Sequence, residues 1–116
     1  MKVLVVDDEV PARARLHAML ADIHGYEVCG EAANGHEALQ LCASEQPDVV
    51  LMDIRMPGMD GLEAARHLQQ LQQPPAIIFT TAYNDYALQA FETHAVDYLL
   101  KPVRQERLLD ALLHAQ

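Results

Sequence analysis

Short apolar runs alternate five times along the chain with segments whose apolar residues have helical spacing. Strands that alternate with helices in this way are typical of βαβ units, so the pattern predicts an α/β fold with a parallel sheet. The predicted strands are residues 2–7, 26–31, 49–53, 76–81 and 96–100. Because no linker or repeat interrupts the pattern, we expect residues 1–116 to form a single doubly wound, five-stranded (βα)5 domain.

Five helices are expected between and after these strands. They are predicted over residues 11–23, between Asn34-Gly35 and Pro47, over 62–71, over 85–92, and from Arg104 to the end. Asn84 or Asp85 is the expected N-cap of the fourth helix, since a short polar side chain can accept a hydrogen bond from the first turn. The pairs Asn34-Gly35 and Pro57-Gly58 indicate turns.

Ionisable and hydroxyl side chains stand at the ends of four predicted strands. In an open parallel sheet, the carboxyl ends of the strands line one crevice, and ligands bind there. The side chains in question are those of Asp7, Asp8, Asp53, Thr81 and Lys101. The sequence therefore predicts one small site built from three carboxylates, a hydroxyl and an ammonium group.

The adjacent carboxylates of Asp7 and Asp8 indicate a cation site. Neighbouring like charges raise each other's energy unless a cation offsets them. Hard oxygen ligands suit Mg²⁺, which takes one or two protein carboxylates together with water and phosphate oxygens. The alternative is an acidic helix start that is favoured by the helix dipole.

Asp53 ends an almost unbroken apolar strand, where burying a lone carboxylate is costly. With Mg²⁺ and a phosphoryl donor, such a carboxylate can act as a nucleophile and form an acyl phosphate. The alternative is a turn aspartate before the Pro57-Gly58 loop.

Lys101 can contact phosphate oxygens as a compact point charge, or it can be an ordinary surface lysine. The Lys101-Pro102 step is a candidate for a cis peptide bond. Thr81 can donate its hydroxyl to a phosphoryl oxygen. Because side chains alternate along a strand, Thr80 and Thr81 cannot both point to the same place.

Composition narrows the class of protein. The formal net charge of -9 argues against a chain that wraps nucleic acid by itself, because phosphate binding needs a positive surface. No segment has the length of a membrane span or the pattern of a signal peptide. Cys29 and Cys42 lack CxxC spacing and are interpreted as small packed residues, which fits a reducing, cytoplasmic setting.

The motifs at the strand ends resemble those of the receiver domains of bacterial two-component response regulators. The resemblance covers the full length of the chain and implies their CheY-like, flavodoxin-like fold. It is carried by Val5–Glu9, Asp53–Gly61, Thr81-Ala82 and Lys101-Pro102. It implies that a sensor histidine kinase phosphorylates Asp53, and that the domain is not an enzyme beyond assisting its own phosphorylation and dephosphorylation.

The resemblance also implies the roles of the other site residues. Mg²⁺ would be held by Asp8, by Asp53, by the backbone carbonyl of Arg55, and by Asp7 partly through water. Thr81 would bind the phosphoryl group and Lys101 would pair with it, while Tyr98 occupies the position of the family's aromatic switch.

A finer resemblance is to the receivers of LytTR-type transcription regulators, the group that includes AlgR. It is carried by Pro11–Leu16, Tyr86–Phe91 and Ala95–Val103. The resemblance to receiver domains in general implies a phosphorylation-favoured homodimer through residues 85–115. DNA binding would come only through a C-terminal LytTR domain, which we expect to be absent from this sequence.

Residues next to the predicted site bear on the lifetime of the phosphoryl group. Arg55 and Tyr83, each two residues beyond a site residue, are expected to flank the group together with Ala82 and to shield it. The alternative is that the two bulky residues are solvated side chains at the rim.

Two rival functions remain at this point. The first is a hydrolase with Asp53 as nucleophile, but such an enzyme usually has an acid two residues later, where this chain has Arg55. The second is an interaction module on the same fold that works without phosphorylation, since a fold alone does not imply a function.

Overall fold

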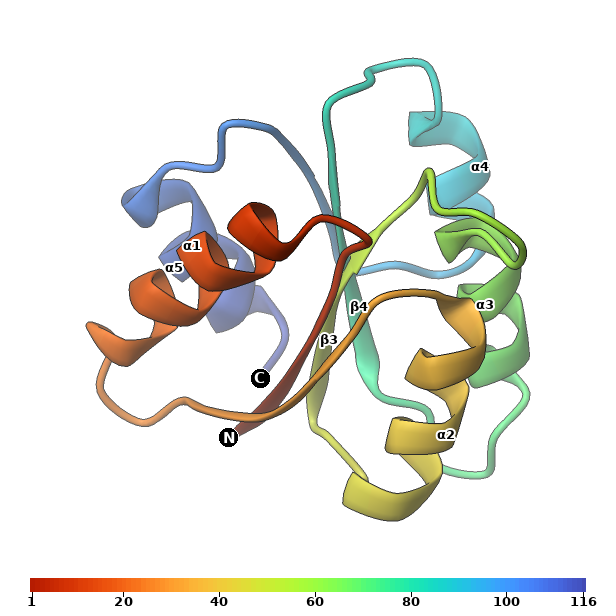
Figure 1. The fold of residues 1–116 in the computed structure, drawn as a ribbon, viewed down its shortest axis with the longest axis horizontal. Helices are drawn as coiled ribbons and strands as arrows, with labels where there is room; N and C mark the ends of the chain where they lie inside the picture. The colour runs from red at the N-terminus through yellow and green to blue at the C-terminus, as the bar shows by residue number, and fades with distance from the viewer.

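The computed structural model describes residues 1–116 as five parallel strands and five helices (Figure 1). The strands are β1 (Lys2–Val6), β2 (Glu27–Ala32), β3 (Val49–Asp53), β4 (Ala76–Thr81) and β5 (Asp97–Leu100). The helices are α1 (Val10–Ala21), α2 (Gly35–Glu45), α3 (Gly61–Gln69), α4 (Ala87–Glu92) and α5 (Gln105–His114). Strands and helices alternate along the whole chain, which confirms the predicted (βα)5 fold.

The strands form one sheet in the order β2-β1-β3-β4-β5. Helices α1 and α5 cover one face, and α2, α3 and α4 cover the other (Figure 1). Strand β2 lies on one side of β1 in the sheet, and β3, the next strand along the chain, lies on the other side of β1. Ligands bind beyond the carboxyl ends of the strands at such a reversal of strand order, and β1 and β3 both end there.

Side-chain alternation divides the sheet into two cores. Leu51 of β3 and Ile78 of β4 pack with α1 and α5, whereas Met52 and Phe79 pack with the helices on the opposite face. Strands buried on both faces read as continuous apolar runs, which is why the sequence pattern identified the central strands so well.

Boundaries differ from the predictions by one or two residues at several ends. Strand β2 covers 27–32 rather than 26–31, and its register with β1 shifts between Val3 and Leu4. The prediction that Asn84 or Asp85 caps α4 is wrong, because Tyr86 precedes this short helix and no side chain caps it. The second helix does begin at its predicted turn, where the Asn34 side chain accepts a hydrogen bond from the Glu37 N–H.

None of the five helices combines the length and the apolar character that crossing a lipid bilayer requires.

Candidate functional site

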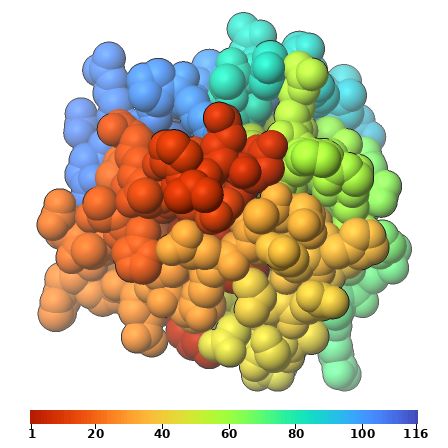
Figure 2. Space-filling view, viewed as in Figure 1, coloured from red at the N-terminus to blue at the C-terminus, as the bar shows by residue number.

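Three carboxylates meet at the carboxyl ends of β1 and β3. Oxygen atoms of Asp7, Asp8 and Asp53 all lie within 4.8 Å of one another. Asp7 and Asp53 are buried, whereas Asp8 is exposed at the mouth of the cluster. In Figure 2, the residues that follow β1 (red) lie next to those that follow β3 (yellow-green) and β4 (cyan-green) at the upper rim of the molecule. This grouping of hard oxygen donors around one exposed opening fits Mg²⁺.

Lys101 provides the positive charge of the site. Its Nζ donates a hydrogen bond to Oδ2 of Asp7 at 2.7 Å and lies 3.6 Å from Oδ2 of Asp53. The lysine follows β5, and the peptide bond between Lys101 and Pro102 is cis. The lysine therefore contacts both buried carboxylates and offsets part of their repulsion.

The buried carboxylates are not equivalent in their protonation. Burial, together with the nearby charge of Asp7, raises the pKa of Asp53 to about 6, although Lys101 acts in the opposite direction. Burial opposes the charged form of Lys101, but its hydrogen bond to Asp7 and the charge of Asp53 raise its pKa above the ordinary value. Asp53 is thus a carboxylate whose charge is only partly compensated by the protein itself.

The backbone around Asp53 is held by a glycine. The Ile54 N–H donates to Oδ1 of Asp53 at 2.9 Å, and the Gly61 N–H donates to the Ile54 carbonyl at 2.8 Å. A Cβ atom on Gly61 would lie against the Asp53 carbonyl oxygen and 3.0 Å from the Ile54 Cα. The start of α3 can therefore approach the end of β3 this closely only because residue 61 has no side chain.

The two threonines of β4 face opposite sides of the sheet. Thr80 lies on the same face of β4 as Ile78, which packs with α1 and α5, whereas Thr81 lies on the same face as Phe79. Thr81 is fully buried, and its hydroxyl accepts a hydrogen bond from the Tyr83 N–H at 3.2 Å. Thr80 is equally buried and was not among the residues that the sequence analysis assigned to the site.

Tyr98 is linked to Thr81 through the backbone of the loop after β4. The Tyr98 hydroxyl donates to the Tyr83 carbonyl, and the Tyr83 N–H donates to Thr81. The Tyr98 ring is partly buried against the core on the α2, α3 and α4 side. A movement of the Thr81 hydroxyl would therefore be transmitted to Tyr98 through the backbone of Tyr83.

Arg55 and Tyr83 contact each other between two of the loops at the carboxyl ends of the strands. The Arg55 Cζ lies 4.4 Å from the centroid of the Tyr83 ring, a cation–π contact between the loops that follow β3 and β4. Tyr83 also meets Tyr86 edge to face, with ring centroids 6.4 Å apart. Ala82 is exposed beside them.

Arg13 is a further site neighbour that the sequence analysis did not identify. Its Nη1 donates to the Asp7 carbonyl at 2.6 Å, and its Nε contacts Glu31 at 3.3 Å. No signal in the sequence indicates that a residue of this helix contacts the end of β1.

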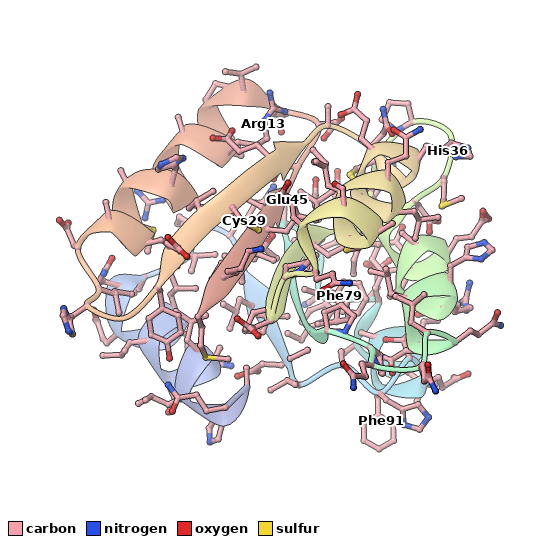
Figure 3. The ribbon with its side chains drawn as sticks, turned by 90° about the horizontal axis from the view of Figure 1, so that it is seen from below. Arg13, Cys29, His36, Glu45, Phe79 and Phe91 are labelled. Carbon is pink, nitrogen blue, oxygen red and sulfur yellow. The ribbon has the colours of Figure 1, made fainter.

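The cysteines and a second acidic cluster lie outside this site. Cys29, labelled in Figure 3, and Cys42 are free thiols. Cys42 lies in the core and Cys29 packs against it, and burial raises the pKa of both, that of Cys42 to about 11. Asp97, Asp110 and His114 also come together, but the Arg107 guanidinium binds both of these carboxylates.

Comparisons with known proteins agree on one class. The family described as response regulator receiver domain matches residues 3–113. The Positive alginate biosynthesis regulatory protein of Pseudomonas aeruginosa is 53% identical over 116 residues, which cover 99% of this chain and 47% of that protein. The Sensory transduction protein LytT of Bacillus cereus is 46% identical over 112 residues, which cover 97% of this chain and 46% of that protein. The chain thus spans about half the length of the curated relatives it matches.

Solved structures show the same architecture. The response regulatory domain of mrkE from Klebsiella pneumoniae superposes with a TM-score of 0.90 at 33% identity, covering 97% of this chain and 93% of that one. The response regulator domain of Thermotoga maritima CheB has a TM-score of 0.88 at 27% identity, covering 99% and 96% of the two chains.

Proposed function

The chain belongs to the response regulator receiver family of two-component systems, and we propose that Asp53 is its phosphoacceptor, with a sensor histidine kinase as the donor. The observation that carries this proposal is the cluster of Asp7, Asp8 and Asp53 with Lys101 at the ends of three strands. No other group of side chains in the molecule combines a buried carboxylate, two acidic neighbours and a lysine.

In the proposed reaction, an oxygen of the ionised Asp53 carboxylate attacks the phosphorus of a phosphohistidine. The bond from phosphorus to the imidazole nitrogen breaks, and the nitrogen keeps the electron pair. An acyl phosphate forms on Asp53, and the transferred group carries its negative charge into the carboxylate cluster. Positioning and charge neutralisation are the main demands of such a transfer.

The neighbouring residues would meet these demands. Asp7, Asp8, Asp53 and the Arg55 carbonyl would hold Mg²⁺, which supplies charge neutralisation for the phosphoryl oxygens when it is bound. Lys101 would leave Asp7 to pair with a phosphoryl oxygen, a short displacement since it already lies 3.6 Å from Asp53.

Thr81 and Tyr98 form the proposed switch. A phosphoryl oxygen would accept a hydrogen bond from the Thr81 hydroxyl and draw it away from the Tyr83 N–H, from which that hydroxyl now accepts. The Tyr83 peptide would then shift, together with the Tyr98 hydroxyl that donates to it. A modification moves an equilibrium only through contacts that differ between the two states, and these two hydrogen bonds can differ.

We propose no further enzymatic activity for this chain. In a hydrolase, an acid near Asp53 would protonate the leaving group. The residue two positions later is Arg55, and its guanidinium lies over the Tyr83 ring.

Phosphorylation can be tested directly by intact mass after incubation with Mg²⁺ and acetyl phosphate. The wild type should gain one phosphoryl group, and Asp53→Asn should gain none. Asp60→Asn is a matched control, because Asp60 caps α3 through its Oδ1 and asparagine caps equally well. A wild type without any adduct, even with beryllofluoride as a non-covalent mimic, would favour the interaction module that works without phosphorylation.

The proposed output surface lies on α4, β5 and α5. Large apolar side chains are exposed there, with Phe91 of α4 77% and Leu88 72% exposed, and Phe91 projects from the edge of the molecule in Figure 3. Exposed apolar groups on neighbouring elements favour association. We propose a homodimer through residues 85–115 that phosphorylation strengthens.

Sedimentation of the beryllofluoride-bound domain tests this surface. The wild type should dimerise, and the double variant Leu88→Ser, Phe91→Ser should remain monomeric. Leu71→Ser is the control, since Leu71 is 47% exposed but lies in the loop between α3 and β4. A wild type that stays monomeric at high concentration refutes the dimer for this domain.

The remaining partners follow from the relatives. Because the matched region is about half of each curated relative, we propose that the native protein continues into a C-terminal LytTR domain through which it binds DNA. The two free thiols fit the cytoplasmic location that we propose.

A further inference from the structure

The Thr80 hydroxyl is the one buried side-chain polar atom in the molecule without a hydrogen-bond partner. Thr80 is fully buried in β4, and valine, whose side chain has nearly the same shape, would fill this position as well. Buried hydroxyl groups are nearly always hydrogen-bonded, because a buried hydroxyl without a partner has lost its hydrogen bonds to water and gained none in return. An unpaired hydroxyl at this position therefore calls for a partner that another state of the protein would supply.

Thr80 lies directly beside the proposed phosphoacceptor. Asp53 of β3 and Thr80 of β4 are register partners, and both follow the parity of residues that pack with α1 and α5. Neighbouring strands are separated by about 4.8 Å, so the two side chains stand next to each other on one face of the sheet. On its other side, Thr80 pairs with Leu99, two residues before Lys101.

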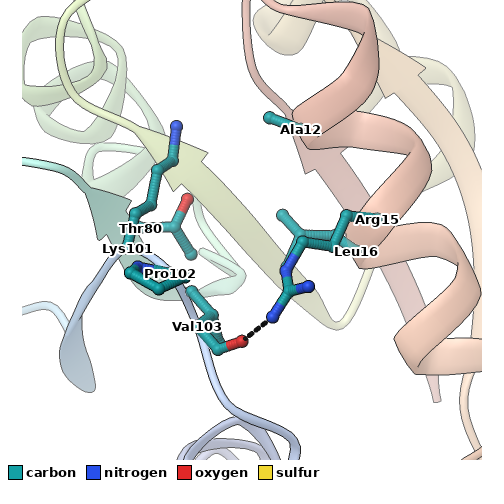
Figure 4. Close-up of a pocket in the computed structure, with 7 residues that line it drawn as sticks. All are labelled: Ala12, Arg15, Leu16, Thr80, Lys101, Pro102 and Val103. Atoms are coloured by element: carbon teal, nitrogen blue, oxygen red, sulfur yellow. Dashed lines mark hydrogen bonds between the residues drawn. The ribbon is translucent and has the colours of Figure 1, made fainter.

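A cavity of about 320 Å³ gives this group room to rearrange. Thr80 and Lys101 line it on the sheet side, and Ala12, Arg15 and Leu16 of α1 line it on the other (Figure 4). Figure 4 shows the Thr80 hydroxyl directed into the space between β4 and α1 rather than toward a protein acceptor. Rotation of the Thr80 side chain about χ1 would turn the hydroxyl toward its strand neighbour.

We propose that Thr80 is a positioning residue for the phosphorylated state, in which its hydroxyl donates a hydrogen bond to the Asp53 carboxyl group. The inference rests on the proposed function of Asp53. Before phosphorylation, Lys101 lies beside Asp53 and partly compensates its charge. Once Lys101 follows the phosphoryl oxygens, the uncommitted donor on this face of the sheet is the Thr80 hydroxyl. The hydrogen bond is therefore made in one state and not in the other, and it stabilises the acyl phosphate.

The test compares Thr80→Val, which keeps the shape and removes the hydroxyl, with Thr80→Ser, which keeps the hydroxyl. We expect Thr80→Val to bind beryllofluoride about tenfold more weakly in the presence of Mg²⁺, as loss of one hydrogen bond to a charged group implies. Its acyl phosphate, followed by intact mass, should also decay faster. Thr80→Ser should restore both properties to near the wild-type values.

Thr93→Val is the matched control, because Thr93 is also buried but its hydroxyl already donates to the Ala90 carbonyl at 2.7 Å. This variant should be less stable in urea and bind beryllofluoride normally. Thr80→Val should show the opposite pattern. It should bind beryllofluoride more weakly, and its free energy of unfolding in urea should not be lower than that of the wild type.

The outcomes separate the two proposals. If the wild type takes up neither the phosphoryl group nor beryllofluoride, the proposed function fails. If the wild type does so and Thr80→Val behaves identically, the role of Thr80 is wrong. If Thr80→Val is impaired and Thr80→Ser is equally impaired, the effect comes from packing and the hydrogen bond is refuted.

Discussion

Replacing the proposed phosphoacceptor by asparagine should make the protein more stable, by an amount that depends on pH. Asp53 is 6% exposed, and its pKa of about 6 stands above the ordinary value of 3.8. Asparagine keeps the oxygen that accepts from the Ile54 N–H, but it carries no charge to be buried. The effect therefore isolates the cost of ionising one carboxylate at this place.

The sign follows from proton linkage. The folded protein holds the Asp53 proton more tightly than the unfolded chain does, so the stabilising effect of that proton is complete at low pH. It is lost as the pH rises through the folded pKa of about 6. A difference of about two pKa units corresponds to ~3 kcal/mol in total, of which about 2 kcal/mol falls between about pH 4.5 and pH 7.5.

The assay is urea denaturation of the wild type and Asp53→Asn in EDTA at several pH values. The stability advantage of the variant should grow by about 2 kcal/mol from about pH 4.5 to pH 7.5. Addition of Mg²⁺ should stabilise the wild type selectively and narrow the gap, because a bound cation offsets the buried charge.

Asp97→Asn is a control of opposite sign. Its hydrogen bonds to Arg107 lower the pKa of Asp97 below 3.8, so its contribution is lost only in more acidic solution. Over the same pH range, its difference from the wild type should be flat. An Asp53→Asn difference that is also flat would show that ionisation of Asp53 is not costly, and the reasoning about the site would be refuted.

Three further predictions concern the neighbours of Asp53. Gly61→Ala should lower the free energy of unfolding by at least ~2 kcal/mol, because the backbone of β3 must move. Gly30→Ala should cost much less in the same urea titration, because the nearest neighbour of its added Cβ is a side-chain atom at 3.4 Å. Lys101→Met should cost about 2 kcal/mol in EDTA, since a buried carboxylate loses its charged donor, and Mg²⁺ should recover part of the loss; equal losses with and without Mg²⁺ would contradict this. Arg55→Ala combined with Tyr83→Ala should shorten the lifetime of the acyl phosphate severalfold by intact mass, and unchanged decay would mean that the pair does not shield it.

Local patterns predicted most of the fold. The central strands are buried on both faces, so β3 and β4 appear as the unbroken runs 49–53 and 76–81, and both predictions match the structure residue for residue. The half-exposed β2 is less distinct and was placed one residue too early. The cap of α4 was misplaced because the helix begins only at Ala87, with Tyr86 before it and no side chain accepting from its first turn.

The candidate site was predictable in composition and not in geometry. Asp7 and Lys101 follow strands and Asp53 ends one, and the parallel arrangement of these strands could be deduced, so their meeting was expected. Their distances, the raised pKa of Asp53 and the link from Thr81 to Tyr98 depend on which groups lose water and which face each other. These are properties of packing that no spacing along the chain encodes.

The sequence by itself determined the alternation of strands and helices, the ends of the strands where polar residues stand, and the resemblance to receiver domains. These depend on local periodicity and on residue types, both of which are visible in one dimension. Only the tertiary structure decided that Thr80 rather than Thr81 shares the face of Asp53 and that its hydroxyl is buried without a partner. The reason is physical: the parity of a strand can be read from its apolar residues, but the side of the sheet that each parity faces is set by the helices that cover it.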